Sequence, residues 1–121
     1  MYISVVTLLV TDLERALNFY TKTLGWEKTM DAPMGPDTRW VTVAPKGEKT
    51  MFTLSKSTLD KIPPFSGVIL EVDDVYKTQE QLKKLGVEFP EPARNEPWGG
   101  WAIFKDSEGN AHGLHSPVRG Q

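Results

Sequence analysis

One segment of the chain occurs twice, and this repeat constrains the fold more than any other feature. Residues 6–27 read VTLLVTDLERALNFYTKTLGWE, and residues 67–88 read GVILEVDDVYKTQEQLKKLGVE. Both copies contain an apolar run, an acidic turn, apolar residues at helical spacing and a Leu-Gly pair. Trp40 and Trp101 stand at matching places further along the two halves. Since a repeat of this kind marks one structural unit built twice, we expect two similar modules in tandem.

The first half is predicted to contain four strands and one helix. Thr11 and Glu14 form a capping box at the start of the helix, and Gly25 is expected to end it in the left-handed conformation. Residues 31–38 are rich in proline and glycine and are expected to be a loop. The expected strands are residues 2–10, 26–30, 39–44 and 50–55, and Val5, Thr7 and Leu9 share one face of the first of them.

The second half repeats this order. Asp73 or Asp74 is expected to cap the helix, Gly86 to end it, and Gly109 to take the left-handed position of the DSEGN turn. The apolar stripe of this helix is expected to consist of Val75, Leu82 and Leu85. The other expected elements are a buried strand over residues 67–72, strands over 87–89, 100–105 and 111–115, and a proline-rich loop over 90–97.

This order predicts the α+β fold class, with two tandem βαβββ modules in one domain. Module one covers residues of about 1–56, a linker covers 57–64, and module two covers about 65–118. A sheet with a single helix can cover only one of its faces with that helix. The other face must curve around something or meet a partner, and it is the natural place for a ligand.

Composition excludes several classes of partner and location. Lys and Arg number 14 against 16 Asp and Glu, so there is no basic surplus to hold a nucleic acid. No apolar run approaches the roughly 20 residues that would span a membrane. The chain has no cysteine, which excludes disulfides, thiolate metal sites and a cysteine nucleophile. We therefore expect a cytoplasmic protein that binds neither nucleic acid nor membrane.

The chain resembles the vicinal oxygen chelate superfamily, which includes glyoxalase I, bleomycin-resistance proteins and extradiol dioxygenases. The resemblance rests on VTLLVTDLERALNFYTKTLGW, on VILEVDDV with KKLGV, and on FKDSEGN, in this order and duplicated. It implies paired βαβββ modules that build a curved mixed sheet around a cup, with the helices on the outer face. It also implies a homodimer in which each cup takes one module from each chain.

Enzymes of this superfamily hold a divalent metal in the cup with His and Glu side chains, and the resemblance places these ligands on particular residues here. They fall at Val5, Gly67 and Gly113, and in the first module near Met51 or Thr53. None of these is a good ligand for a hard metal ion, which needs several imidazole or carboxylate groups. We therefore expect neither a metal nor another cofactor.

Tryptophans supply one group of candidate ligand-binding residues. Trp98 and Trp101 flank two glycines in a WGGW run, and Trp40 is the counterpart of Trp101 in the first half. Indole rings offer flat surfaces for planar ligands, although the same rings could serve core packing or a dimer contact. Arg39 could pair with an anionic ligand group, or could be an ordinary surface residue.

His115 and Glu71 complete the candidate set. His112 and His115 have opposite parity on a strand, so only one of them can face the cup. If Gly113 is the ancestral ligand position, Ala111 and His115 face inward with it, and His112 faces the helices or a dimer seam. Glu71 could reach the cup rim, or could be a solvated strand end.

Three functions remain open at this point. The first is a metal-free small-molecule binding protein of the bleomycin-resistance type, which takes a planar or aromatic compound. The second is a metal-dependent lyase, isomerase or dioxygenase of the same superfamily. The third is an interaction module whose cup is filled by its own side chains, among them Val5, Leu9 and Met51.

Overall fold

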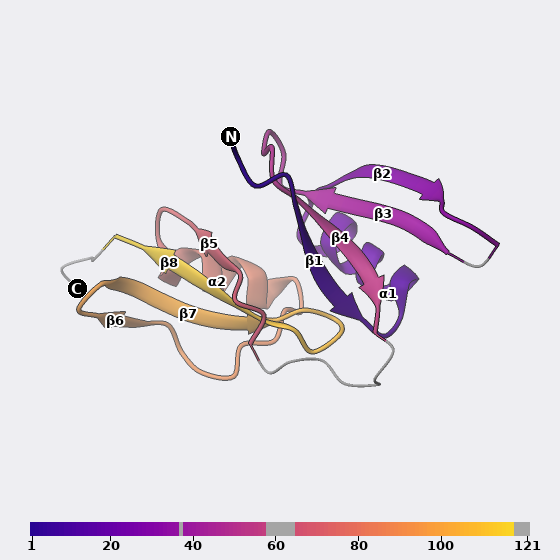
Figure 1. Cartoon of the computed structure of the whole chain (residues 1–121). Helices are drawn as coiled ribbons and strands as arrows, with labels where there is room; N and C mark the ends of the chain where they lie inside the picture. The colour runs from indigo at the N-terminus through magenta and orange to yellow at the C-terminus, as the bar shows by residue number, and fades with distance from the viewer. Residues whose placement is uncertain (37, 58–64, 118–121) are drawn as a thin grey trace. The chain divides into compact units, whose positions relative to one another are not determined.

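The computed structural model describes residues 1–36, 38–57 and 65–117 (Figure 1). These residues form two compact units, module one and module two, each with its own sheet. The linker predicted over 57–64 lies outside the described residues from residue 58 onward. No helix among the residues described is long and apolar enough to cross a bilayer.

Module one is a four-stranded mixed sheet with the strand order β1-β4-β3-β2. Strand β1 runs parallel to β4, and the other pairs are antiparallel. Its elements are β1 (Val5–Val10), α1 (Leu13–Asn18), the wide helical turn η1 (Phe19–Thr23), β2 (Glu27–Pro33), β3 (Arg39–Ala44) and β4 (Met51–Lys56).

The start of α1 corrects the predicted capping box. Asp12, in an extended conformation, accepts a hydrogen bond from the Arg15 backbone N–H at 3.0 Å and is the N-cap. Thr11 instead accepts from the Arg15 guanidinium at 3.1 Å. The capping residue therefore lies one position later than predicted. Gly25 has a φ of 75°, which confirms its left-handed conformation.

The strand bounds of module one differ from the prediction most at β1 and β2, while β4 begins and ends one residue later than predicted. Strand β1 begins at Val5 rather than at residue 2, and β2 continues to Pro33, so the loop predicted over 31–38 is wrong at its start. Proline is tolerated there because β2 is an edge strand, which leaves one row of its N–H groups unpaired by the sheet. Strand β3 has the predicted bounds.

The two faces of this sheet have different roles. One face packs against Ala16, Leu17 and Tyr20 of the helical segment, and these side chains are buried. The strand residues that are buried include Leu8, Val10, Val41, Val43, Phe52 and Leu54. Val5, Thr7 and Leu9 have the opposite parity, as predicted, and point to the face that the helix does not cover.

Module two repeats the same topology, with the strand order β5-β8-β7-β6 and with β5 parallel to β8. This equivalence confirms the internal repeat and the α+β class. Its elements are β5 (Ile69–Glu71), α2 (Val75–Lys84), β6 (Arg94–Glu96), β7 (Gly99–Lys105) and β8 (Ala111–Ser116).

Three strand predictions in module two need correction. The buried strand expected over 67–72 is only Ile69–Glu71, and Ile69 is 54% exposed because it lies on an edge strand and lines the open hollow of the uncovered face. The strand expected over 87–89 is a single bridge between Glu88 and Lys105. The loop expected over 90–97 contains β6, which pairs with the start of β7.

Helix α2 is capped by Asp74, whose side chain accepts hydrogen bonds from two backbone N–H groups. Val75 is fully buried, but Leu85 is 59% exposed, so the predicted apolar stripe is wrong at its end. Gln79 is buried instead. Its carboxamide donates to the Glu91 carbonyl at 3.0 Å and accepts from the Ala93 N–H at 3.1 Å. This glutamine therefore fastens the proline-rich segment to the helix.

His112 faces the helix side of the β5-β8-β7-β6 sheet, as strand parity predicts. It is fully buried, lies edge-on to Phe104 and has its Nδ1 2.6 Å from the Ser66 hydroxyl. Burial lowers the pKa of this imidazole, partly offset by the nearby Asp106 carboxylate. His112 therefore belongs to the core and cannot reach the uncovered face.

Candidate functional site

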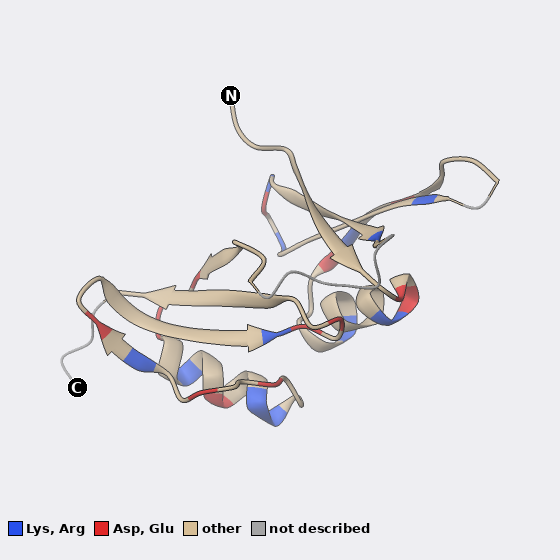
Figure 2. Cartoon of the chain, turned by 60° about the horizontal axis from the view of Figure 1, so that its bottom comes forward, with Lys and Arg blue, Asp and Glu red and all other residues tan. Residues whose placement is uncertain are grey.

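The uncovered face of module two carries a hollow of about 400 Å³ lined by Ile69, Trp98, Trp101 and His115. Three strands and one loop supply these side chains. Ile69 lies on edge strand β5, Trp101 pairs with His115 across β7 and β8, and Trp98 directly precedes β7. Figure 2 shows β7 and β8 almost free of charged residues, and the last residue of β7 is Lys105. The hollow is therefore mainly apolar.

Contacts between aromatic rings fix the orientation of the tryptophans in this hollow. Trp98 and Trp101 meet edge to face, with ring centroids 5.0 Å apart. The Trp98 ring also stacks against the His115 ring at 6.2 Å and an angle of 23°. Trp98 nevertheless remains 53% exposed. An exposed indole in a fixed orientation is a ready surface for a flat ligand.

His115 connects the Trp98 loop to Glu71 of β5 through two hydrogen bonds. Its Nδ1 lies 2.6 Å from a Glu71 carboxylate oxygen, and its Nε2 lies 2.9 Å from the Trp98 carbonyl oxygen. Both partners are acceptors, so the two hydrogen bonds form together only when both ring nitrogens carry a proton, which is the positively charged imidazolium. The Trp98 carbonyl and then Glu71 raise the pKa of His115 above its ordinary value of 6.5.

This arrangement predicts a specific pH dependence. Because the folded-state pKa of His115 is raised, its stabilising effect is fully present below about pH 6.5 and is lost as the pH rises through the folded pKa. The stability advantage of the wild-type protein over His115→Gln should therefore shrink as the pH is raised. Urea denaturation of both proteins at pH values from about 5.5 to about 9, a range that begins below the ordinary pKa of histidine, measures this difference in the free energy of unfolding. A difference that stays constant across that range would show that the imidazolium has no such role.

Gly113 stands where the resemblance places a metal-binding glutamate, and the space above it is filled. A Cβ atom added at Gly113 would lie 2.4 Å from the Trp101 ring. The indole therefore covers the position from which a longer side chain would reach the cup. Among the residues described, no three His, Asp or Glu side chains gather in a way that could hold a metal. The residues present do not fit the metal centre of the superfamily.

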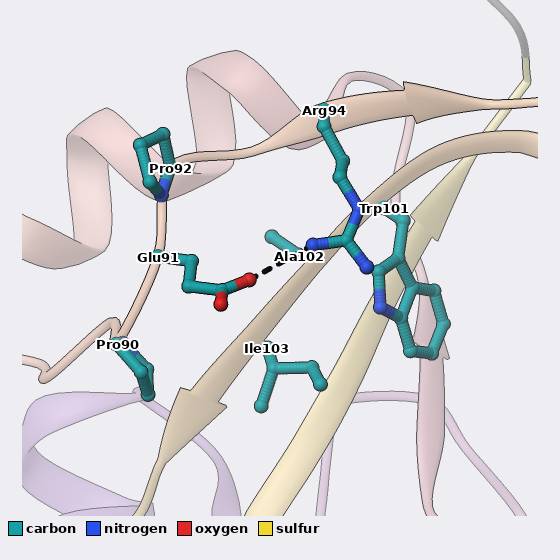
Figure 3. A pocket seen from close by; sticks show the side chains of 7 residues that line it. All are labelled: Pro90, Glu91, Pro92, Arg94, Trp101, Ala102 and Ile103. Atoms are coloured by element: carbon teal, nitrogen blue, oxygen red, sulfur yellow. Dashed lines mark hydrogen bonds and ion pairs between the residues drawn. The ribbon is translucent and has the colours of Figure 1, made fainter.

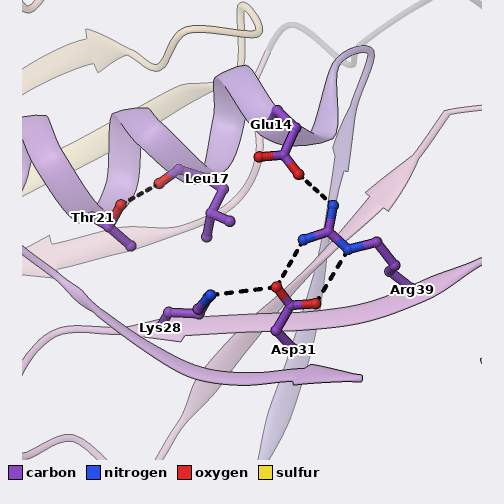
Figure 4. A network of polar contacts seen from close by, with 6 residues as sticks. All are labelled: Glu14, Leu17, Thr21, Lys28, Asp31 and Arg39. Atoms are coloured by element: carbon purple, nitrogen blue, oxygen red, sulfur yellow. Dashed lines mark hydrogen bonds and ion pairs between the residues drawn. The ribbon is translucent and has the colours of Figure 1, made fainter. Parts of the chain in front are cut away.

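Module one has a separate hollow of about 360 Å³ on its own sheet, with Trp40 and Arg39 among the lining residues. The Arg39 guanidinium binds the Asp31 carboxylate at 2.7 and 3.2 Å and also pairs with Glu14 (Figure 4). These carboxylates raise the pKa of Arg39, and Arg39 lowers the pKa of Asp31. Arg39 is thus already engaged in an exposed ion-pair network.

The structure brings together four of the six candidates, namely Trp98, Trp101, His115 and Glu71. Trp40 and Arg39 lie in module one, and their part in ligand binding stays a prediction. Sequence reasoning missed Ile69 as a lining residue. Its parity with Glu71 could have identified it, because alternate residues of a strand share one face.

Comparisons with known proteins agree with this architecture. The sequence model of the Glyoxalase/Bleomycin resistance protein/Dioxygenase superfamily matches residues 2–113. The protein YetH of Bacillus subtilis (strain 168) is 34% identical over 110 residues, which cover 89% of this chain and 92% of YetH.

Two solved structures are similar over nearly their whole length. A member of the same superfamily from Sphaerobacter thermophilus DSM 20745 has 34% identity and a TM-score of 0.86, with 96% of this chain and 97% of that chain covered. TnmS3, an antibiotic binding protein from Streptomyces sp. CB03234, has 35% identity and a TM-score of 0.84, with 98% and 97% covered. The duplicated module, its strand order and these matches together show that the chain belongs to the Glyoxalase/Bleomycin resistance protein/Dioxygenase superfamily.

Proposed function

We propose that the protein binds a planar or aromatic small molecule in the hollow of module two, without a metal or another cofactor, and that it does so in the cytoplasm. The observation that carries this proposal is the apolar hollow bounded by Trp98, Trp101, His115 and Ile69. Its volume of about 400 Å³ falls in the usual range of ligand pockets. The likeness to an antibiotic binding protein supports the same type of function.

The ring geometry indicates the shape of the ligand. Trp98 is half exposed, and its ring is oriented by Trp101 and His115. A planar ring that stacks on an indole gains about 0.5–1.5 kcal/mol beyond the area it buries. Contacts with both tryptophans and enclosure of the ligand are compatible with micromolar affinity, about −8 kcal/mol.

Tryptophan fluorescence tests the proposal. Titration with a panel of planar antibiotics and aromatic metabolites should quench the emission of the wild-type protein. Trp98→Ala should weaken the binding of an active compound by about tenfold or more, since each 1.4 kcal/mol is one decade. The matched control is Trp26→Ala, because Trp26 lies in module one and packs against the buried Tyr20 and Phe52. The Trp26→Ala substitution should lower the free energy of unfolding while changing the affinity for the ligand little.

A panel in which no compound quenches the fluorescence would favour the interaction-module interpretation, in which the cup needs no small ligand. Equal affinity of the wild-type protein and Trp98→Ala for an active compound would place the ligand elsewhere. Either result contradicts the proposed site.

The alternative function is a metal-dependent lyase, isomerase or dioxygenase, as superfamily membership allows. The glycine at position 113 and the indole above it oppose this alternative. Elemental analysis of tag-free protein after dialysis should find no stoichiometric divalent metal, and added Ni²⁺ or Zn²⁺ should produce no glyoxalase activity. A retained stoichiometric metal, or activity that depends on added metal, would favour the enzyme.

We also propose that the protein is a homodimer. Edge strands β1 and β2 of one sheet, and β5 and β6 of the other, have one side without a partner strand in their own sheet. Such edges and an uncovered face are commonly covered by a second subunit. The mass in solution at micromolar concentration should be twice the 13.6 kDa of one chain. A mass of one chain would contradict the dimer.

A further inference from the structure

The Trp101 indole also lines a second hollow in module two. This hollow has a volume of about 190 Å³, and Pro90, Pro92 and Ile103 form other parts of its wall (Figure 3). Its position follows from the strand register, because Arg94 of β6 is paired with Trp101 of β7. Trp101 thus borders both hollows of module two.

Arg94 supplies an unused donor at the second hollow. Its Nη1 donates to Glu91 at 2.9 Å, and its Nε donates to Glu96. Its Nη2 has no hydrogen-bond partner within residues 1–36, 38–57 and 65–117. Figure 3 shows the guanidinium between the Glu91 carboxylate and the Trp101 indole. A ligand atom that accepts a hydrogen bond can therefore be bound at Nη2.

The charges around this donor select the kind of acceptor. The guanidinium already faces two carboxylates, Glu91 and Glu96, and these three groups together carry a formal charge of −1. An anionic ligand group would be repelled by both carboxylates. A neutral oxygen such as a carbonyl meets no such repulsion and still receives a hydrogen bond from a charged donor, which is the stronger kind.

The size of the hollow limits the group that enters it. A protein cavity of about 150 Å³ binds one benzene molecule, so a hollow of about 190 Å³ accommodates one six-membered ring. Its walls include the Trp101 indole and the apolar side chains of Pro90, Pro92 and Ile103. A ring in this position would lie beside Arg94.

We propose that the second hollow holds one ring of the bound planar ligand, and that Arg94 Nη2 donates a hydrogen bond to a neutral carbonyl oxygen on it. This inference rests on the proposed function and specifies the chemical class of its ligand: a planar aromatic compound with a carbonyl group. The two hollows on either side of Trp101 then form one extended site.

A matched pair of probes tests this inference. Fluorene and 9-fluorenone have the same planar ring system and differ at one carbon, which is a CH₂ group in fluorene and a carbonyl group in 9-fluorenone. Equilibrium dialysis should show that the wild-type protein binds fluorenone about tenfold or more tightly than fluorene, since a hydrogen bond to a charged group has at least that effect. The affinities of the Arg94→Met variant for the two probes should differ by no more than about a factor of two.

Two further variants separate the possible outcomes. Lys105→Met removes a cation from the same strand as Trp101, outside the hollow, and should keep the preference for fluorenone. Trp98→Ala should weaken the binding of both probes by the same factor and leave the ratio of their affinities unchanged. In the wild-type protein, at saturation with each probe, the ¹⁵N signal of Arg94 Nε should shift further with fluorenone than with fluorene, a measurement that remains valid if Arg94→Met does not fold.

Equal binding of the two probes to the wild-type protein would overturn the Arg94 inference and leave the proposed function intact. A preference for fluorenone that persists in Arg94→Met would also overturn it. If neither probe binds, the inference fails together with the proposed function for this class of ligand.

Discussion

Replacing Gly99 by alanine is expected to destabilise module two by about 2–6 kcal/mol. Gly99 has a φ of 137°, a conformation that costs a residue with a side chain about 1–3 kcal/mol. The added Cβ would also lie 2.4 Å from His115 Nε2 and 2.5 Å from the Ser116 carbonyl oxygen. Crowding of this kind costs about 1–3 kcal/mol more. Urea denaturation measures the total.

Gly109→Ala is the matched control for this prediction. Gly109 also has a positive φ, 90°, but nothing lies within 4 Å of its added Cβ. It should therefore cost only the conformational penalty, about 1–2 kcal/mol. Since Gly99→Ala pushes against the His115 ring that holds the Trp98 carbonyl, it should also weaken ligand binding, and Gly109→Ala should not. Equal effects of the two substitutions would show that the contact with His115 is unimportant.

Gly113→Ala is expected to reduce the affinity for a planar ligand by about tenfold or more, because the contact it disturbs is one of the two proposed stacking surfaces. The new methyl group would occupy the space of the Trp101 ring, 2.4 Å from its nearest atom. The indole must move, and the overpacking should cost about 1–3 kcal/mol of stability. Isothermal titration calorimetry and urea denaturation measure the two effects.

A double-mutant cycle identifies the cause of that loss. In a Trp101→Leu background the large ring is absent, so Gly113→Ala should have a much smaller effect on stability than in the wild-type protein. Additive effects of the two substitutions would mean that Gly113 does not act through Trp101. Such a result would remove the steric argument against a metal-binding side chain at this position.

Much of the fold could be predicted because local signals agree with the tertiary structure. The repeated apolar runs mark a strand in each module, the second shorter than predicted, and Asp74, Gly25 and Gly86 mark a helix start and helix ends, as the structure confirms. The parity of His112 and His115 also places one ring in the core and one on the uncovered face. These features depend on neighbouring residues only.

The errors occur where tertiary contacts override local composition. Strand β6 lies in a segment rich in proline and charge, and pairing with β7 rather than propensity makes it a strand. Gln79 is buried although the predicted apolar stripe omits it, because its carboxamide satisfies backbone groups of that segment. Leu85 is exposed because α2 ends before it.

The candidate site could be predicted only in part. The WGGW run and the position of His115 indicate an aromatic surface, but the hydrogen bonds from His115 to Glu71 and Trp98 join residues far apart in the sequence. The contact between Trp101 and Gly113 likewise depends on the side-chain rotamer of the tryptophan. No local pattern encodes these contacts, so only the structure reveals that the loop and the hollow are organised around His115.

The most direct test of the central claim is NMR observation of the four tryptophan indole N–H groups during titration with 9-fluorenone. Single Trp→Phe variants assign the four signals. Our account predicts that the signals of Trp98 and Trp101 shift in a saturable way, and that the signal of Trp26, which packs against Tyr20 and Phe52 of module one, stays in place. Saturable binding of fluorenone that leaves the Trp98 and Trp101 signals unchanged would contradict it.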